Sequence, residues 1–226
     1  MLPVRAKHAL AGWPIAACDK GNGLMIEDMF GDVPQVEVDW YPHWLSPEEA
    51  AVALSALVDE VQWKQDSMRT PGGVKPLPRL TAWQGDPGAV YLYSGIRNEP
   101  DQWTPTVYAL KSLAETTCGA RFNSVLLNRY RSGEDSMGWH ADREPELGAQ
   151  PVIASVSLGA TRRFDLRHNE TGLLRAFELT NGGLLVMRGR TQRDWRHRVA
   201  KVPGLRGERI NLTFRCVTAG AGESKK

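Results

Sequence analysis

The most strongly patterned stretch of the chain is Arg209-Ile210-Asn211-Leu212-Thr213-Phe214-Arg215-Cys216. Its strict alternation of polar and apolar residues is typical of a β-strand with one buried face. The apolar face contains Ile210, Leu212, Phe214 and Cys216, and the polar face contains Arg209, Asn211, Thr213 and Arg215. Because six residues of strand span roughly 20 Å, two arginine side chains leaning toward each other could frame a small dicarboxylate. The alternative is a surface strand with a charged outer face.

Short β-rich runs separated by Gly and Asn precede this strand from Asn123 onward. The expected strands cover residues 124–130, 151–158, 163–166, 173–179, 184–187 and 210–216. Several short strands in succession, with almost no helix between them, predict a β-sandwich or barrel.

Two helices are expected before the β-rich region. The first begins at Ser46, which can cap it, with Pro47 at the first helical position and Glu49 completing a capping box. The second begins at the Thr-Pro pair 104–105 and ends near Gly119. The apolar faces are Leu54, Val58 and Val61 in the first helix, and Val107, Leu110 and Ala114 in the second.

Length and composition indicate one domain with extensions. The chain has 226 residues, of which 42% are hydrophobic, enough for an ordinary core. Residues 1–36 are expected to form an N-terminal extension, 37–218 the domain and 219–226 a tail. The three cysteines form no CxxC, and no segment approaches the ~20 apolar residues of a membrane span. We therefore expect a monomeric cytoplasmic protein without membrane association.

The net charge of +2 is only mildly basic, so charge permits a polyanionic partner without demanding one. Residues 64–80 are rich in turn-forming residues and are expected to form a loop that includes Thr70-Pro71-Gly72-Gly73. Four basic residues lie in this stretch, namely Lys64, Arg69, Lys75 and Arg79. They could contact phosphates or simply be solvated surface charges.

A candidate metal site begins with His140-Ala141-Asp142. In an extended segment, residues two apart point to the same face, so this tripeptide presents an imidazole beside a carboxylate. Two His and one carboxylate form the facial site of non-haem Fe(II) oxygenases, although an HxD alone is weak evidence. The third ligand is expected downstream on another strand, and His197 fits best by position and elimination, with His168 as the fallback. Together with this site, a carboxylate-binding role for Arg209 and Arg215 becomes the favoured interpretation.

At this point the chain resembles the AlkB-type dioxygenases over roughly residues 60–216. The matching segments are Asn128-Arg129-Tyr130, His140-Ala141-Asp142, residues 153–160, His197 and residues 209–215. Residues 78–83, continuing to Tyr91-Leu92-Tyr93-Ser94-Gly95, resemble above all the subgroup of the second and third human homologues, especially the single-strand-preferring third. The fold implied is mainly β with flanking helices, a double-stranded β-helix or jelly roll.

The resemblance also implies roles for individual residues. It implies that His140, Asp142 and His197 bind iron, and that Asn128, Tyr130, Arg209, Asn211 and Arg215 hold 2-oxoglutarate. It further implies base contacts by Tyr91, Leu92, Tyr93 and Glu144, although simple sheet packing is the alternative for the two tyrosines. With Fe(II), 2-oxoglutarate and O2, such an enzyme is expected to remove alkyl groups from bases of the 1-methyladenine and 3-methylcytosine type, in DNA alkylation damage repair.

The partner implied is alkylated DNA or RNA, and a single strand is favoured. Duplex-active members carry a bulky apolar wedge, whereas the counterpart here is Thr70-Pro71-Gly72-Gly73. Two other functions remain open: a 2-oxoglutarate oxygenase acting on protein or a small molecule, and a catalytically inactive jelly-roll binding module.

Overall fold

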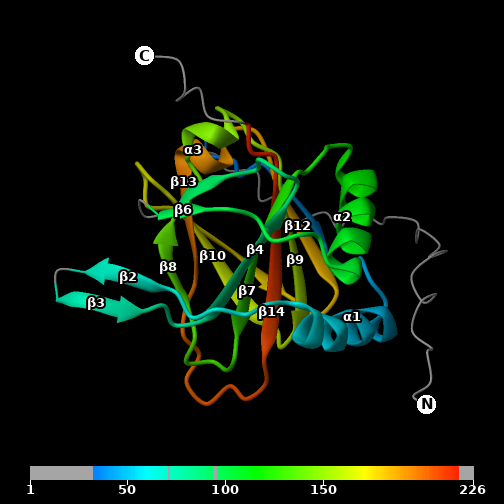
Figure 1. Ribbon diagram of the computed structural model, residues 1–226. Coiled ribbons are helices and arrows are strands. Elements are labelled where there is room, and N and C mark those ends of the chain that lie inside the picture. Colours follow the sequence, from blue (N-terminus) through cyan, green and yellow to red (C-terminus); the bar gives the residue numbers. More distant parts are fainter. Residues whose placement is uncertain (1–32, 71, 94–95, 219–226) are drawn as a thin grey trace, which may run out of the picture.

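Two antiparallel sheets face each other, and two helices cover the outer side of the larger one (Figure 1). This computed structural model describes residues 33–70, 72–93 and 96–218, without the side chains of residues 70 and 91–98. In spatial order, the large sheet contains β1 (Val38–Tyr41), β12 (Gly183–Met187), β9 (Ile153–Gly159), β14 (Arg209–Arg215), β7 (Ser124–Tyr130) and β4 (Leu80–Gly85). The small sheet contains β11 (Leu174–Leu179), β10 (Arg162–His168), β13 (Trp195–Val199) and β8 (Met137–His140).

From β7 onward the chain passes back and forth between the two sheets. Strands β7, β9, β12 and β14 belong to the large sheet, and β8, β10, β11 and β13 belong to the small one. Two sheets of four such strands form a double-stranded β-helix, extended here at the edges of the large sheet by β1 and β4. The expected jelly roll, mainly β with flanking helices, is confirmed.

The two faces of the large sheet pack into separate cores. Toward the helices its strands contribute, among others, Val125, Leu127, Val156, Leu158, Ile210, Leu212 and Phe214. Toward the small sheet they contribute Tyr130, Ile153, Leu185 and Met187, which meet Phe164, Leu166, Leu179, Trp195 and Val199. Because the helices cover the outer face of the large sheet, the polar side chains of its strands can converge in the space between the two sheets.

Helices α1 (Pro47–Glu60) and α2 (Pro105–Cys118) begin where expected, and α2 also ends where expected. Ser46 and Glu49 form the capping box of α1, and α2 ends at Gly119, whose φ of 63° suits glycine. The buried face of α2 includes Val107, Leu110 and Ala114, as predicted. The face of α1 is centred differently, on Ala50, Ala53 and Leu57, while Leu54 and Val58 are only partly buried. Among the described residues, no helix has the length and apolar character needed to cross a membrane.

Strand β14 lies in the middle of the large sheet, between β9 and β7. Its alternation is confirmed, because Ile210, Leu212 and Phe214 enter the helix-facing core. Its polar residues are also buried, which rules out a charged surface strand. The prediction was wrong for Cys216, which follows the end of the strand and is exposed.

Residues 64–80 form more regular structure than the expected loop. β2 (Ser67–Thr70) and β3 (Gly73–Pro76) pair as a hairpin that projects from the body of the molecule (Figure 1). A second hairpin joins β5 (Tyr91–Tyr93) and β6 (Ile96–Asn98). Pro and Gly residues, which suggested a loop, also occur in a strand of this hairpin, since β3 begins at Gly73 and ends at Pro76. The short helices α3 (Thr191–Asp194) and η1 (Pro145–Leu147) were not predicted.

Replacing Leu57 with alanine is expected to lower the free energy of unfolding by about 2–5 kcal/mol, because a cavity would remain in a packed core. Leu57 is fully buried between α1 and the large sheet. Val52→Ala is the matched control, since Val52 lies on the same helix and is 54% exposed. Urea denaturation would measure both, and equal midpoints for the two variants would contradict the packing described here.

Candidate active site

A cavity that is partly open to solvent lies between the two sheets. Side chains from both sheets line it. The polar ones include Asn128, Tyr130, His140, Asp142, Ser155, His197, Arg209, Asn211, Thr213 and Arg215. The apolar ones include Leu126, Met137, Phe164, Leu179, Met187 and Val199. The cavity therefore combines charged groups with an apolar wall, as small-molecule sites commonly do.

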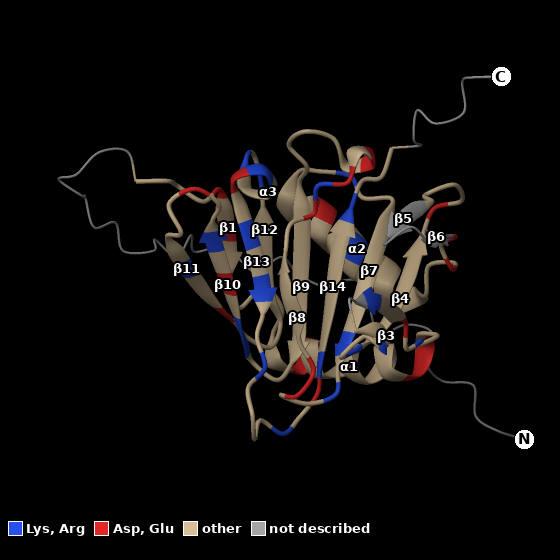
Figure 2. Ribbon diagram, turned by 90° about the vertical axis from the view of Figure 1, so that its left-hand side faces the viewer, with Lys and Arg blue, Asp and Glu red and all other residues tan. Residues whose placement is uncertain are grey.

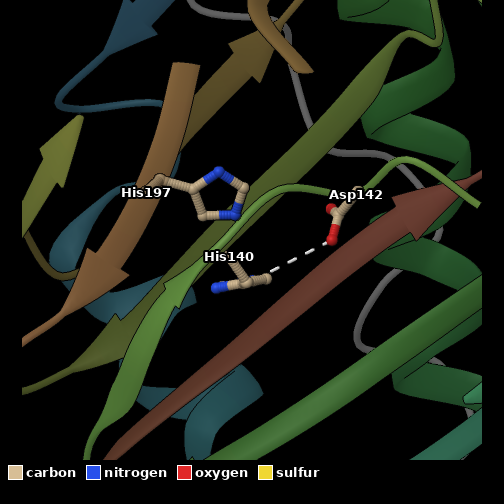
Figure 3. A group of neighbouring side chains, drawn as sticks. All are labelled: His140, Asp142 and His197. Carbon is tan, nitrogen blue, oxygen red and sulfur yellow. Dashed lines mark ion pairs between the residues drawn. The ribbon is translucent and has the colours of Figure 1, made fainter. Parts of the chain in front are cut away.

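His140 and His197 lie side by side on paired strands of the small sheet (Figure 3). They are register partners in β8 and β13, and their ring centroids are 4.2 Å apart. His140 Nδ1 lies 2.9 Å from the carbonyl oxygen of Gly138, which can only accept, so Nδ1 carries the proton. That leaves His140 Nε2 with a free lone pair for a metal ion.

Asp142 completes the group from a loop, not from a strand. β8 ends at His140, so Asp142 lies just beyond the strand, yet its side chain lies beside that of His140, as the two-residue spacing suggested. Asp142 Oδ2 accepts hydrogen bonds from Arg215 Nη2 at 2.8 Å and Nε at 3.2 Å. The other oxygen, Oδ1, lies 3.9 Å from His140 Nε2 (Figure 3). Arg215 thus occupies one carboxylate oxygen and leaves the second for a metal ion.

The protonation states of this group suit metal binding. Burial, together with neighbouring His140, lowers the pKa of His197 to about 3, so the imidazole is neutral. Burial alone would raise the pKa of Asp142, but Arg215 and the two imidazoles outweigh it and lower the value to about 2. A neutral imidazole and an ionised carboxylate are the forms that coordinate a metal.

The ligand atoms of His140, Asp142 and His197 all lie within 4.8 Å of one another. Two His and one carboxylate with open positions favour non-haem Fe(II). His168, the fallback, is not brought to this group, since it lies at the end of β10 with Nδ1 3.1 Å from Thr171 Oγ1.

A second polar cluster lies in the same cavity around Arg209. Arg209 is 1% exposed, and its Nη2 donates to Ser157 Oγ at 2.7 Å. Its Nε and Nη1 are buried without a hydrogen-bond partner among the described residues. Burial lowers the pKa of Arg209 to about 10, which still leaves the guanidinium charged at neutral pH. A buried cation with unused donors is costly unless an anion binds there, so this cluster fits a carboxylate.

The other predicted 2-oxoglutarate residues also line the cavity. Asn128 Oδ1 accepts from Arg79 Nε at 2.7 Å, which leaves its NH2 group as a donor. Tyr130 is buried, with its ring centroid 5.2 Å from the Arg209 guanidinium. Asn211 donates to Ser155 Oγ and the Val156 carbonyl, so its amide also holds β14 against β9. Arg79 was not predicted from the sequence to be a neighbour of this site.

Arg79 was grouped with surface cations, but it is 4% exposed and bonded to Asn128 and to the Ser136 carbonyl, so it is no phosphate contact. Glu144 Oε2 is buried, with no hydrogen-bond partner among the described residues. The predicted base contacts Tyr91, Leu92 and Tyr93 form β5, but their side chains lie outside the described part of the structure.

Comparison with known families agrees with this donor set. The family model described as the 2OG-Fe(II) oxygenase superfamily matches residues 37–215. The chain therefore belongs to the 2OG-Fe(II) oxygenase superfamily. The cofactors of that family are Fe(II) and 2-oxoglutarate, used with O2, and the two clusters in the cavity fit them.

Individual relatives lie within the AlkB group. The chain is 44% identical over 187 residues to "Alpha-ketoglutarate-dependent dioxygenase alkB homolog 3" of Rattus norvegicus, covering 78% of this chain and 63% of the relative. It is 43% identical to the Homo sapiens protein of the same name, and the match covers 78% of this chain and 65% of the relative. Identity to "DNA oxidative demethylase ALKBH2" of Arabidopsis thaliana is 39% over 184 residues, covering 70% and 59%. The chain thus spans less than two thirds of each relative, and the resemblance to the second and third AlkB homologues is confirmed.

A solved structure shows the same fold. The structure of OsALKBH1 matches with a TM-score of 0.56 and 18% identity, covering 82% of this chain and 99% of that one.

Proposed function

We propose that this chain is an Fe(II)- and 2-oxoglutarate-dependent dioxygenase that removes alkyl groups from nucleic-acid bases. The observation that carries the proposal is the placement of His140, Asp142 and His197 in one cavity with the buried, partly unbonded Arg209. The name "DNA oxidative demethylase" of one similar protein supports DNA as a substrate. The bases that we expect this chain to restore are of the 1-methyladenine and 3-methylcytosine type. Repair of alkylated DNA is the corresponding role.

Iron(II), when bound with 2-oxoglutarate and O2, supplies the oxidation: one oxygen atom enters succinate as CO2 leaves, and the other becomes a hydroxyl on the alkyl carbon. The chain's own residues hold and shield the reactants. Arg209 would bind the co-substrate carboxylate, and Phe164, Leu179 and Met187 would keep water from the site. The hydroxylated group then breaks its C–N bond and releases an aldehyde, the hydroxyl proton goes to solvent, and the bond electrons return to the base.

Glu144 would select for the damaged base. A base alkylated at such a ring nitrogen is cationic, and a buried carboxylate oxygen without another partner attracts it. Such a base also pairs poorly, so extracting it from a helix costs less than extracting a normal base. Tyr91, Leu92 and Tyr93 remain proposed contacts.

The direct test is mass spectrometry of oligonucleotides that carry 1-methyladenine or 3-methylcytosine. With Fe(II), ascorbate and 2-oxoglutarate, we expect loss of the alkyl mass together with succinate formation. DNA and RNA oligonucleotides would be run in parallel, with methylated peptides as the rival substrate. Succinate formation only with peptides would favour a protein-directed oxygenase. Its absence in every reaction, despite bound iron, would favour a binding module.

Alkylated single strands are expected to react about tenfold or more faster than the same lesion in a duplex. Opening a base stack costs a few kcal/mol unless a side chain fills the gap, and the stretch Thr70-Pro71-Gly72-Gly73, the proposed counterpart of the wedge, has no bulky apolar side chain. Gly72→Phe should narrow the difference, whereas Gly73 is less suitable because its φ is 101°. Single-turnover rates on matched oligonucleotides would measure the ratio. Equal rates on both strand types would contradict the proposal.

Binding to either oligonucleotide is expected to weaken with added salt, because Arg69 and Lys75 on the hairpin are exposed and could contact phosphates. Arg69→Ala combined with Lys75→Ala should reduce the slope of log Kd against log salt by roughly two. Lys201→Ala is the control, since Lys201 is exposed elsewhere and pairs with Glu134. Figure 2 shows basic residues on several elements, so part of the salt dependence should remain in the double variant. An unchanged slope in the double variant would assign phosphate binding to other residues.

We also propose that the protein is a cytoplasmic monomer, with residues 37–218 as its catalytic domain. The free thiols of Cys118 and Cys216 suit a reducing compartment. The large exposed apolar side chains that the structure describes are scattered over several elements, which gives no single patch for self-association. Light scattering and cell fractionation would test the two statements.

A further inference from the structure

The short helix α3 is bonded to the loop that follows β8. The backbone N–H of Asp142 donates to Gln192 Oε1 at 2.9 Å. Arg143 Nε donates to the Gln192 carbonyl at 2.6 Å, and Arg143 Nη2 donates to the Arg193 carbonyl. Two residues of the loop are thus joined to two residues of α3, about 50 positions downstream.

Asp142 needs such support more than its two neighbours do. His140 and His197 are register partners within the small sheet, so strand pairing fixes their positions. Asp142 lies beyond β8, and strand pairing does not hold its backbone. Arg215 orients the carboxylate, but a bond to the side chain alone leaves the backbone free to shift. Among the described residues, the other hydrogen bond that holds Asp142 is the one from its N–H to Gln192 Oε1.

Gln192 is well placed to supply this support. It is 3% exposed, so water does not compete for its Oε1. Its Nε2 lies 3.1 Å from Met187 Sδ, which fixes the amide with the oxygen toward Asp142. α3 leads directly into β13, the strand that carries His197. Gln192 therefore ties the carboxylate to the strand of a neighbouring imidazole.

We propose that Gln192 and Arg143 form a clamp that positions Asp142 for metal binding. Gln192 is a positioning residue, since it would act through Asp142 and does not touch the ion. The inference rests on the proposed metal site. Because the loop continues to Glu144, the same clamp also fixes the start of the segment proposed to contact the base.

The test is the affinity of the full chain for Mn(II) alone, measured by electron paramagnetic resonance of the unbound ion. Gln192→Leu is expected to bind Mn(II) about 10- to 100-fold more weakly, the range typical for outer-shell partners of metal ligands. The absorption spectrum of the Co(II)-loaded variant should also change, because the carboxylate ligand is no longer held in place. Arg143→Gln, at an exposed position, should weaken Mn(II) binding less.

Gln84→Leu is the matched control. Gln84 is 2% exposed, and its Oε1 accepts from the backbone N–H of Thr104 at 3.0 Å, far along the chain from the metal site. It should lower the melting temperature as Gln192→Leu does, yet leave Mn(II) affinity unchanged. If Gln192→Leu fails to fold, Arg143→Gln decides.

The possible outcomes distinguish a failure of the proposed metal site from a failure of the proposed clamp. No Mn(II) binding by the unsubstituted chain would overturn the proposed metal site, and the clamp with it. Normal binding by the unsubstituted chain together with equal affinity in Gln192→Leu, or in Arg143→Gln where that variant decides, would overturn the clamp alone. Equal losses in Gln84→Leu and Gln192→Leu would assign Gln192 a purely structural role.

Discussion

Alanine at any one of His140, Asp142 or His197 is expected to abolish turnover and to weaken metal binding by more than the 10- to 100-fold typical of outer-shell changes. Each residue supplies one of the three ligand atoms that lie within 4.8 Å of one another. An ion that loses one of three protein ligands keeps an incomplete facial site. The Asp142 change should be especially severe, because it also removes the carboxylate to which the buried Arg215 donates. Mn(II) affinity and succinate formation would measure the two effects.

His168→Ala is the control for this series. His168 is also buried, but its Nδ1 lies beside Thr171 Oγ1 and its ring packs against Trp195, away from the three-residue group. The His168→Ala variant should be less stable than the unsubstituted chain but should bind the metal ion with the same affinity. Full activity in His197→Ala, or loss of metal binding in His168→Ala, would move the third ligand.

The parts of the fold that the sequence predicted are those encoded by local patterns. Strand β14 alternates residue by residue, and the Ser46–Glu49 capping box needs only contacts three positions apart. Such signals are independent of the rest of the chain. The β2–β3 hairpin was missed because Pro and Gly occur both in loops and in hairpin turns, and only pairing partners distinguish them.

The sequence predicted which three residues the fold brings together as a candidate metal site. It did not predict the contacts that hold them in place. The spacing of His140 and Asp142 suggested that their side chains lie together, and they do, but spacing cannot reveal that β8 ends at His140 and leaves Asp142 in a loop. Arg79 was grouped with the surface cations, because the sequence does not show that its side chain donates a hydrogen bond to Asn128, which lies 49 residues further along the chain. Gln192 gave no signal at all, since a glutamine that contacts a backbone N–H has no motif. Residues that position ligands are therefore the part that required the structure.

Arg209→Lys is expected to weaken 2-oxoglutarate binding by about 10- to 100-fold, because hydrogen bonds to charged groups contribute roughly 1.5–3 kcal/mol. Arg215 is already bonded to Asp142, which places it at the metal end of the cavity. The 2-oxo acid end of the co-substrate can chelate a metal ion, which leaves its far carboxylate for the unused donors of Arg209. A lysine keeps the charge but cannot present two parallel donors. Titration of 2-oxoglutarate into the Mn(II)-loaded protein would measure the change.

Substitutions of Arg209 and Arg215 should therefore have different effects on metal affinity and on 2-oxoglutarate affinity. Arg209→Lys should leave Mn(II) affinity unchanged, since Arg209 bonds Ser157 and not a candidate ligand. Arg215→Lys should weaken both metal and co-substrate binding, because it disturbs Asp142 as well. Arg131→Lys, at a partly exposed arginine paired with Asp135, should alter neither. Unchanged 2-oxoglutarate affinity in Arg209→Lys would mean that this buried guanidinium serves only to join β14 to β9.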